Sequence, residues 1–171
     1  MPLIRDRRFT RDDWLRPEAG AGAELPWYGK LLLSRERLSA EGASLADAGH
    51  LIGVEIANDT PPADLEAWLP SLHLIAIQFP KSADGRGFSL ARRLRRMGYK
   101  GELRAVGHVI PDQYALALSC GFDTVEISDS LAARQPEEQW REALASMSWA
   151  YQAGGARQRS ILAARWAALT Q

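Results

Sequence analysis

The 171-residue sequence has a single cysteine, Cys120, only three histidines, and no excess of charge of either sign. One cysteine excludes an internal disulfide, a cysteine-ligated zinc and an iron–sulfur cluster held by one chain. Its 21 basic and 21 acidic side chains cancel, so no overall field attracts nucleic acid. We therefore expect no nucleic-acid partner. The sequence identifies no cofactor, and a redox role would need a bound cofactor or a partner protein that supplies one.

Long hydrophobic runs are also missing. No run reaches the roughly 18 apolar residues that span a membrane, and the opening MPLIRDRRFTRDDW is charged where a signal peptide has its apolar core. We expect a cytoplasmic protein with no membrane partner. The length fits one domain with a single hydrophobic core.

Composition divides the chain into three parts. Residues 1–29 are predicted to form an N-terminal arm and linker, because mixed charges precede the flexible segment EAGAGAE. Residues 30–152 form the predicted α/β domain, and residues 153–171 a C-terminal amphipathic helical tail. The tail packs either on its own domain or on a neighbouring subunit, which leaves a homo-oligomer open.

Apolar runs and helical periods alternate through the middle of the chain. Strands are predicted over 30–34, 51–57, 73–79, 102–106 and 124–128. Helices are predicted between them, over 36–47 with a break near Gly42, then 63–69, 88–97 and 111–119. Another helix is expected from Pro136. This alternation with short connections indicates parallel strands joined by right-handed crossovers.

The two faces of the predicted sheet differ, because successive side chains of a strand point to opposite sides. One face is apolar throughout, whereas the other carries charged and amide side chains. A doubly wound sheet needs two apolar faces, but a (β/α) barrel keeps polar groups inside. The favoured fold is therefore an α/β partial (β/α) barrel with helices on one face, completed by the tail or a second subunit. A flavodoxin-like open sheet is the alternative.

Four side chains of the polar face, Glu55, Gln78, Arg104 and Glu126, are expected to converge on the concave side. Two carboxylates around one guanidinium form the hydrogen-bonded network that charges need away from water. Such a network is either part of an active site centred on Arg104 or a buried structural network without a substrate.

The segment Asp84-Gly85-Arg86-Gly87 follows a predicted strand and opens a predicted helix, where parallel α/β proteins bind ligands. Gly85 and Gly87 let the backbone approach an anion, with Arg86 and Ser89 beside it. The alternative is a tight turn in which Asp84 caps the helix and Arg86 pairs locally.

His108 follows the next strand and can exchange protons near neutral pH, with Asp84 or Asp112 to orient it. A surface histidine without a catalytic role is the alternative. The three histidines are too far apart in sequence for a recognisable metal motif, so no metal site is predicted.

The motifs FPKSADGRGFSLARRLRR, GELRAVGHVIPDQ and CGFD occur in this order between Phe79 and Asp123. Together they resemble a bacterial family known as domain of unknown function 934, over roughly residues 51–152. The family pattern is matched at Asp84, Gly85, Arg86, Gly87, Ser89, Glu102, Arg104, Asp112, Gln113, Cys120 and Asp123. His108 stands where the family usually has Asp, and Gln78 where an acidic residue is usual, which weakens a catalytic role for His108.

The resemblance implies a role beside assimilatory sulfite reductase, and family members carry the label of oxidoreductase. We therefore expect an accessory protein that binds sulfite reductase or a small oxyanion at the concave strand ends. Two alternatives remain, namely an enzyme acting on a small anionic metabolite and a non-catalytic oligomeric scaffold.

Overall fold

The structure is a computed structural model that describes residues 1–17 and 28–145. The predicted helical tail over 153–171 and most of the predicted linker lie outside the described residues. Eight strands form one sheet in the order β2-β1-β8-β7-β6-β5-β4-β3. The strands are β1 (Leu3–Arg5), β2 (Arg8–Thr10), β3 (Trp14–Leu15), β4 (Lys30–Ser34), β5 (Leu51–Ile56), β6 (Leu72–Phe79), β7 (Glu102–Gly107) and β8 (Thr124–Glu126).

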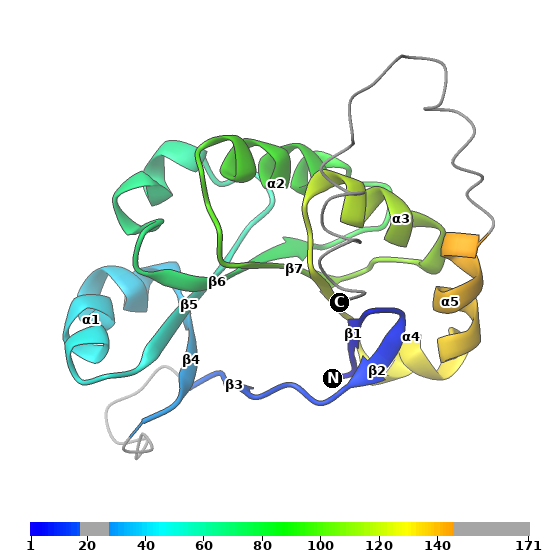
Figure 1. Cartoon of the computed structure of the whole chain (residues 1–171), viewed down its shortest axis with the longest axis horizontal. Helices are drawn as coiled ribbons and strands as arrows, with labels where there is room; N and C mark the ends of the chain where they lie inside the picture. Colours follow the sequence, from blue (N-terminus) through cyan, green and yellow to red (C-terminus); the bar gives the residue numbers. More distant parts are fainter. Residues whose placement is uncertain (18–27, 146–171) are drawn as a thin grey trace, which may run out of the picture.

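Helical segments connect the strands from β4 to β8 and follow β8. They are α1 (Arg35–Asp47), the 3-10 helix η1 (Pro62–Trp68), α2 (Arg86–Arg96), α3 (Pro111–Cys120), α4 (Asp129–Arg134) and α5 (Glu137–Ala145). Each strand from β4 to β7 pairs in parallel with the next one along the chain. A flavodoxin-like sheet would instead reverse its strand order part-way. The sheet curls, and α1, α2 and α3 lie on its outer side (Figure 1). The predicted partial barrel is thus confirmed.

The first fifteen residues belong to the sheet rather than to a separate arm. Strand β1 pairs antiparallel with both β2 and β8, while β3 pairs in parallel with β4 at the opposite edge. Since β2 and β3 are the two edges of the sheet, residues 11–13 connect one edge directly to the other. Figure 1 shows this blue segment crossing the open side of the curled sheet. Residues 11–13 therefore span the open side of the half-barrel, a role that the sequence had assigned to the tail or to a second subunit.

The outer face of the sheet carries the main core, as the alternation of side chains predicts. Ile52, Val54, Ile75, Ile77, Leu103 and Val125 are buried there under the helices. A smaller apolar cluster lies on the inner face, formed by Trp14, Leu32, Leu74, Ala76 and Val106. Gly53 makes room for the indole, because a Cβ at that position would lie 2.9 Å from a Trp14 ring atom.

Two helices differ from the prediction. Helix α1 continues through Gly42, where a break was expected. The glycine serves packing, because a Cβ there would lie 2.8 Å from Leu38 and 3.3 Å from the Trp68 ring. The segment after Pro61 forms a 3-10 helix of only seven residues, a form that is common in short connections. Across the described ranges, no helix has the length and apolarity needed to cross a membrane.

Candidate functional site

The inner face of the curled sheet brings together the four polar side chains chosen from the sequence. Glu55 comes from β5, Gln78 from β6, Arg104 from β7 and Glu126 from β8. Gln78 Nε2 donates to Glu55 Oε1 at 2.8 Å, and Arg104 Nη1 donates to Glu126 Oε2 at 3.1 Å. The period of two along each strand is what aims all four side chains inward.

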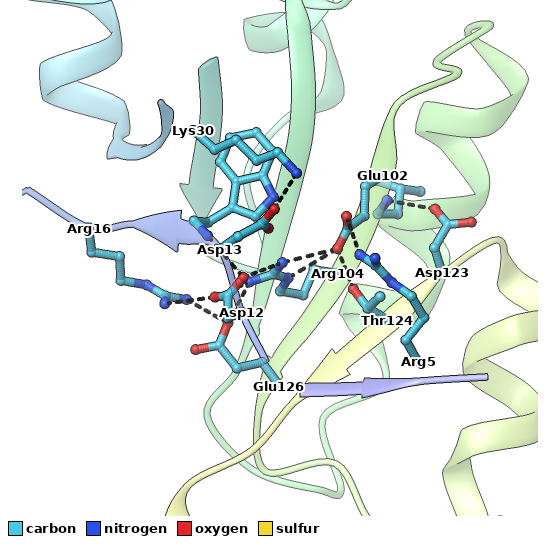
Figure 2. A network of polar contacts seen from close by, with 12 residues as sticks. Arg5, Asp12, Asp13, Arg16, Lys30, Glu102, Arg104, Asp123, Thr124 and Glu126 are labelled. Carbon is cyan, nitrogen blue, oxygen red and sulfur yellow. Dashed lines mark hydrogen bonds and ion pairs between the residues drawn. The ribbon is translucent and has the colours of Figure 1, made fainter. Parts of the chain in front are cut away.

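Arg104 is the centre of this network and is fully buried. Its Nη1 and Nη2 donate to the two oxygens of Asp12, at 2.7 and 3.0 Å, in a forked arrangement (Figure 2). Nε and Nη2 also donate to Glu102 Oε1, at 3.3 and 3.1 Å. Burial on its own would lower the pKa of Arg104, but hydrogen bonding to Asp12 and the charge of Glu102 raise it. The guanidinium is therefore permanently charged, and all three of its nitrogens are engaged.

Arg16, which follows β3, connects the N-terminal segment (residues 11–17) to Glu126 and Glu55 of the same network. Its Nη2 donates to Glu126 Oε2 at 2.7 Å and its Nε to Glu55 Oε2 at 3.1 Å. Burial opposes the charge of Arg16, but the Glu126 and Glu55 carboxylates raise its pKa. The N-terminal segment thus contributes one carboxylate, Asp12, and one guanidinium, Arg16, to the concave face.

When the residues around Arg104 are included, the network carries one more negative than positive charge. Arg5 pairs with Glu102 at 2.9 Å, and Thr124 Oγ1 donates to Glu102 Oε1 at 2.7 Å. The network then holds three arginines (Arg5, Arg16, Arg104) and four carboxylates (Asp12, Glu55, Glu102, Glu126), a sum of 3 − 4 = −1. Glu126 is fully buried, and its Oε1 has no hydrogen-bond partner within the described ranges. These charges do not favour an additional anion at this place.

The predicted anion loop is occupied by its own carboxylates. Asp84 Oδ1 accepts from the backbone N–H of Arg86 at 3.2 Å, and Asp84 Oδ2 accepts from Arg86 Nη2 at 2.7 Å. Arg86 Nη1 also donates to Asp59 Oδ2 at 3.2 Å. Hydrogen bonding to Arg86, with a smaller contribution from Asn58, holds the pKa of Asp84 well below its usual range. The local pairing of Arg86 with Asp84 matches the alternative that the sequence left open, although the residue at the N-cap of α2 is Gly85 and no side chain caps the helix.

Among the other residues of the predicted anion site, Gly87 has a packing role. Gly87 is buried, and a Cβ there would lie 2.5 Å from the Phe79 ring. Ser89 is exposed on α2. Gln113 fixes the preceding loop from α3, since its Nε2 donates to the backbone oxygen of Ser82 at 2.6 Å. Gly85 is exposed and opens α2.

His108 and Asp112 are exposed and do not join the Arg104 network. The backbone N–H of His108 donates to the Phe79 carbonyl at 2.8 Å. No hydrogen bond or ion pair links its imidazole to Asp84 or Asp112 in the described part of the chain. Cys120 is buried at the end of α3. Within residues 1–17 and 28–145, no group of histidine, cysteine and acidic side chains could hold a metal ion.

Asp12 and Arg16 were missed in the sequence, although a local signal exists. Asp12 and Trp14 alternate with the exposed Arg11, Asp13 and Leu15. Arg16 continues the same spacing of two, so an extended segment points all three to one side. That side is the concave face, where Trp14 fills the space above Gly53 and the two charged residues meet β7 and β8. A segment of five residues is too short for the alternation to be distinguished from chance.

The fold and the site together define an α/β half-barrel whose polar interior is filled by its own N-terminal segment. The chain belongs to the DUF934 family, described as bacterial protein of unknown function, whose model matches residues 53–162. A comparison with curated proteins finds no match. Glu55, Gln78, Arg104 and Glu126 lie inside the matched range, whereas Asp12 and Arg16 precede it.

Proposed function

We propose that this protein is an accessory protein of assimilatory sulfite reduction, and that it acts by binding sulfite reductase. The pathway comes from the family resemblance, which implies a place beside that enzyme. The mode of action is supported by the concave face, where Arg104 gives all of its nitrogens to carboxylates of the same chain. A guanidinium in this state has no donor left for a small oxyanion.

The second predicted anion site supports the same choice. Arg86 pairs with Asp84 and Asp59, and Asp84 also accepts the backbone N–H at the start of α2. A sulfite or sulfate ion would have to displace a carboxylate that is already held by several hydrogen bonds. Binding to a protein surface requires no such displacement, so we favour a partner protein over a small anion.

The test combines a growth assay with a binding assay. A strain lacking the gene should grow poorly on sulfate or sulfite as sole sulfur source and normally on sulfide, because only the reduction step is affected. The purified protein should bind purified sulfite reductase from the same organism in biolayer interferometry. Normal growth on sulfite together with the absence of a complex would refute the proposal.

A parallel titration separates this proposal from the enzyme alternative. Sulfite and sulfate added to the purified protein should give no saturable heat in calorimetry. Saturable binding that is lost in Arg86→Ala or Arg104→Met, with the variant still folded by circular dichroism, would instead place a small anion at that guanidinium and favour the enzyme.

A further inference from the structure

One face of helix α2 carries a cluster of positive charges that the fold itself does not use. Arg92, Arg93 and Arg96 on the helix and Lys100 just after it are exposed. None of their four side chains has an ion pair or hydrogen bond to any residue in the described ranges. We call these four residues the α2 basic face.

The helical period places this face directly opposite the core. At about 100° per residue, Arg92, Arg93 and Arg96 fall within roughly 100° of one another. Leu90, Ala91 and Leu94 are buried on the other side of the helix. Because α2 lies on the outer side of the curled sheet (Figure 1), the α2 basic face points away from the protein.

Arg95, in the same helix, has a structural role, because its side chain is bound to other parts of the fold. Its guanidinium donates to the backbone oxygens of Tyr99, Gly101 and Gly121, and it pairs with Asp123 at 2.6 Å. A cation in the last turn also stabilises the helix dipole, a task that Arg95 already performs. Arg92 and Arg96, by contrast, are like charges four residues apart, an arrangement that destabilises a helix. Helix stability therefore does not account for the cluster.

We propose that the α2 basic face is the docking surface for an acidic patch on a folded partner protein. This inference deepens the proposed function and rests on it, since an accessory protein needs a surface for its partner. Charge complementarity identifies the partner's chemistry, because four unpaired cations within nine residues attract a cluster of carboxylates. Met97 adds an apolar contact at the same place, with 38% of its surface exposed.

A protein partner fits these observations better than a nucleic acid. A nucleic-acid-binding domain typically combines its basic patch with an isoelectric point above about 9, whereas this chain has no net charge and an isoelectric point near 6.8. Arginine and methionine are enriched in protein–protein interfaces. The α2 basic face offers three arginines and Met97 lies beside it, over an area of one helix and the turn after it.

The test compares wild type with the triple variant Arg92→Glu/Arg93→Glu/Arg96→Glu, using purified sulfite reductase as the probe in biolayer interferometry. We expect wild-type affinity to fall as salt is raised, and the triple variant to bind at least about tenfold more weakly. A matched control reverses three other exposed cations without partners in the described ranges, Arg8, Lys81 and Arg141. The control should bind like wild type although its net charge equals that of the triple variant.

A neutral variant, Arg92→Gln/Arg93→Gln/Arg96→Gln, guards against a folding defect, because glutamine keeps the helix propensity of arginine. It should also lose affinity while its thermal midpoint stays at the wild-type value. Equal binding by wild type and by both α2 variants would overturn the docking surface and leave the proposed function standing.

If wild type does not bind sulfite reductase, the proposed function fails and the surface is tested separately. A photo-crosslinking amino acid at Met97 is compared in living cells with the same group at Leu51, which is also exposed. Adducts with an acidic protein segment that disappear in the triple variant would support the docking surface. No adducts beyond those at Leu51, or adducts sensitive to nuclease, would overturn it.

Discussion

Replacing Asp12 by alanine removes the carboxylate that holds the N-terminal segment across the half-barrel. Asp12 accepts two hydrogen bonds from Arg104, at 2.7 and 3.0 Å, and its side chain is only 15% exposed. Arg104 is fully buried, so water does not readily take the place of the lost oxygens. The change should destabilise the fold and loosen residues 11–13 from the concave face.

The magnitude follows from two opposing effects. Removing one partner of a buried ion pair costs about 3 to 5 kcal/mol. Arg104 keeps Glu102 and Glu126, and the loss of one carboxylate relieves the excess negative charge of the network. We therefore expect a loss just below this range, about 2 to 3 kcal/mol. The relief of repulsion offsets only part of the cost, because the lost hydrogen bonds are direct whereas the repulsive charges lie beyond the guanidinium. A loss of this size lowers Tm by roughly 5 to 10 °C in a chain of this length.

Asp13 is the matched control for this experiment. It is the next residue and also a paired carboxylate, but it pairs with Lys30 at the surface, with 63% and 38% of the two side chains exposed. Asp13→Ala should cost less than about 1 kcal/mol, because exposed ion pairs contribute little. Urea unfolding followed by tryptophan fluorescence measures both variants, and Trp14 lies within the affected segment.

Equal losses for Asp12→Ala and Asp13→Ala would refute this reasoning, since burial would then not decide the strength of the contact. An Asp12→Ala variant as stable as wild type would also refute it. That outcome would mean that relief of repulsion among Glu55, Glu102 and Glu126 offsets the lost bonds.

Two further predictions concern packing and pH. Gly87→Ala should destabilise the fold by about 1 to 3 kcal/mol, because the added methyl would press on the Phe79 ring. Gly85→Ala, whose Cβ would have no atom closer than 4.0 Å, should change the stability by no more than about 0.5 kcal/mol. Urea midpoints that did not separate the two variants would contradict the packing role of Gly87. Burial raises the pKa of Tyr99 above its ordinary value of 10.0. The neutral phenol therefore stabilises the folded state below pH 10, and this contribution is lost as the pH rises further. Urea midpoints measured from pH 9 to pH 11 should fall less steeply in Tyr99→Phe than in wild type. An equal slope in the two proteins would contradict this role of the Tyr99 phenol.

The half-barrel and its polar face could be predicted because both depend on local patterns. Strands β5 to β8 each show the period of two, so Glu55 and Gln78 had to point to the same side wherever the strands lay in space. The contact between them, Gln78 Nε2 to Glu55 Oε1, joins neighbouring parallel strands on one face, with Gln78 two residues beyond Ala76, the residue opposite Glu55. Sequential strand order and short connections supplied the rest.

The N-terminal strands could not be predicted in the same way. Strands β1, β2 and β3 contain three, three and two residues, which is too short for a period to show. Their stability comes from partners far along the chain, such as Leu3 opposite Glu126. Charged residues near a chain start are usually solvated, so Asp12 gave no sign that it would reach Arg104, a residue 92 positions away.

The contact between Asp12 and Arg104 changes how the polar interior of this half-barrel is interpreted. Inward-pointing charges near the strand ends of a barrel indicate a ligand site when the chain itself does not satisfy them. Here Asp12 and Arg16 pair with Arg104 and Glu126, and only Glu126 Oε1 is left without a hydrogen-bond partner within the described ranges. The same contacts attach residues 12–16, which include the short edge strand β3, to β7 and β8. The charges of the concave face and the attachment of the N-terminal segment are therefore one feature. An apolar side chain in place of Arg104 would leave Asp12 only its contacts with Trp14 and Arg16 of the same segment, so the attachment of Asp12 to the sheet depends on a buried charge on β7.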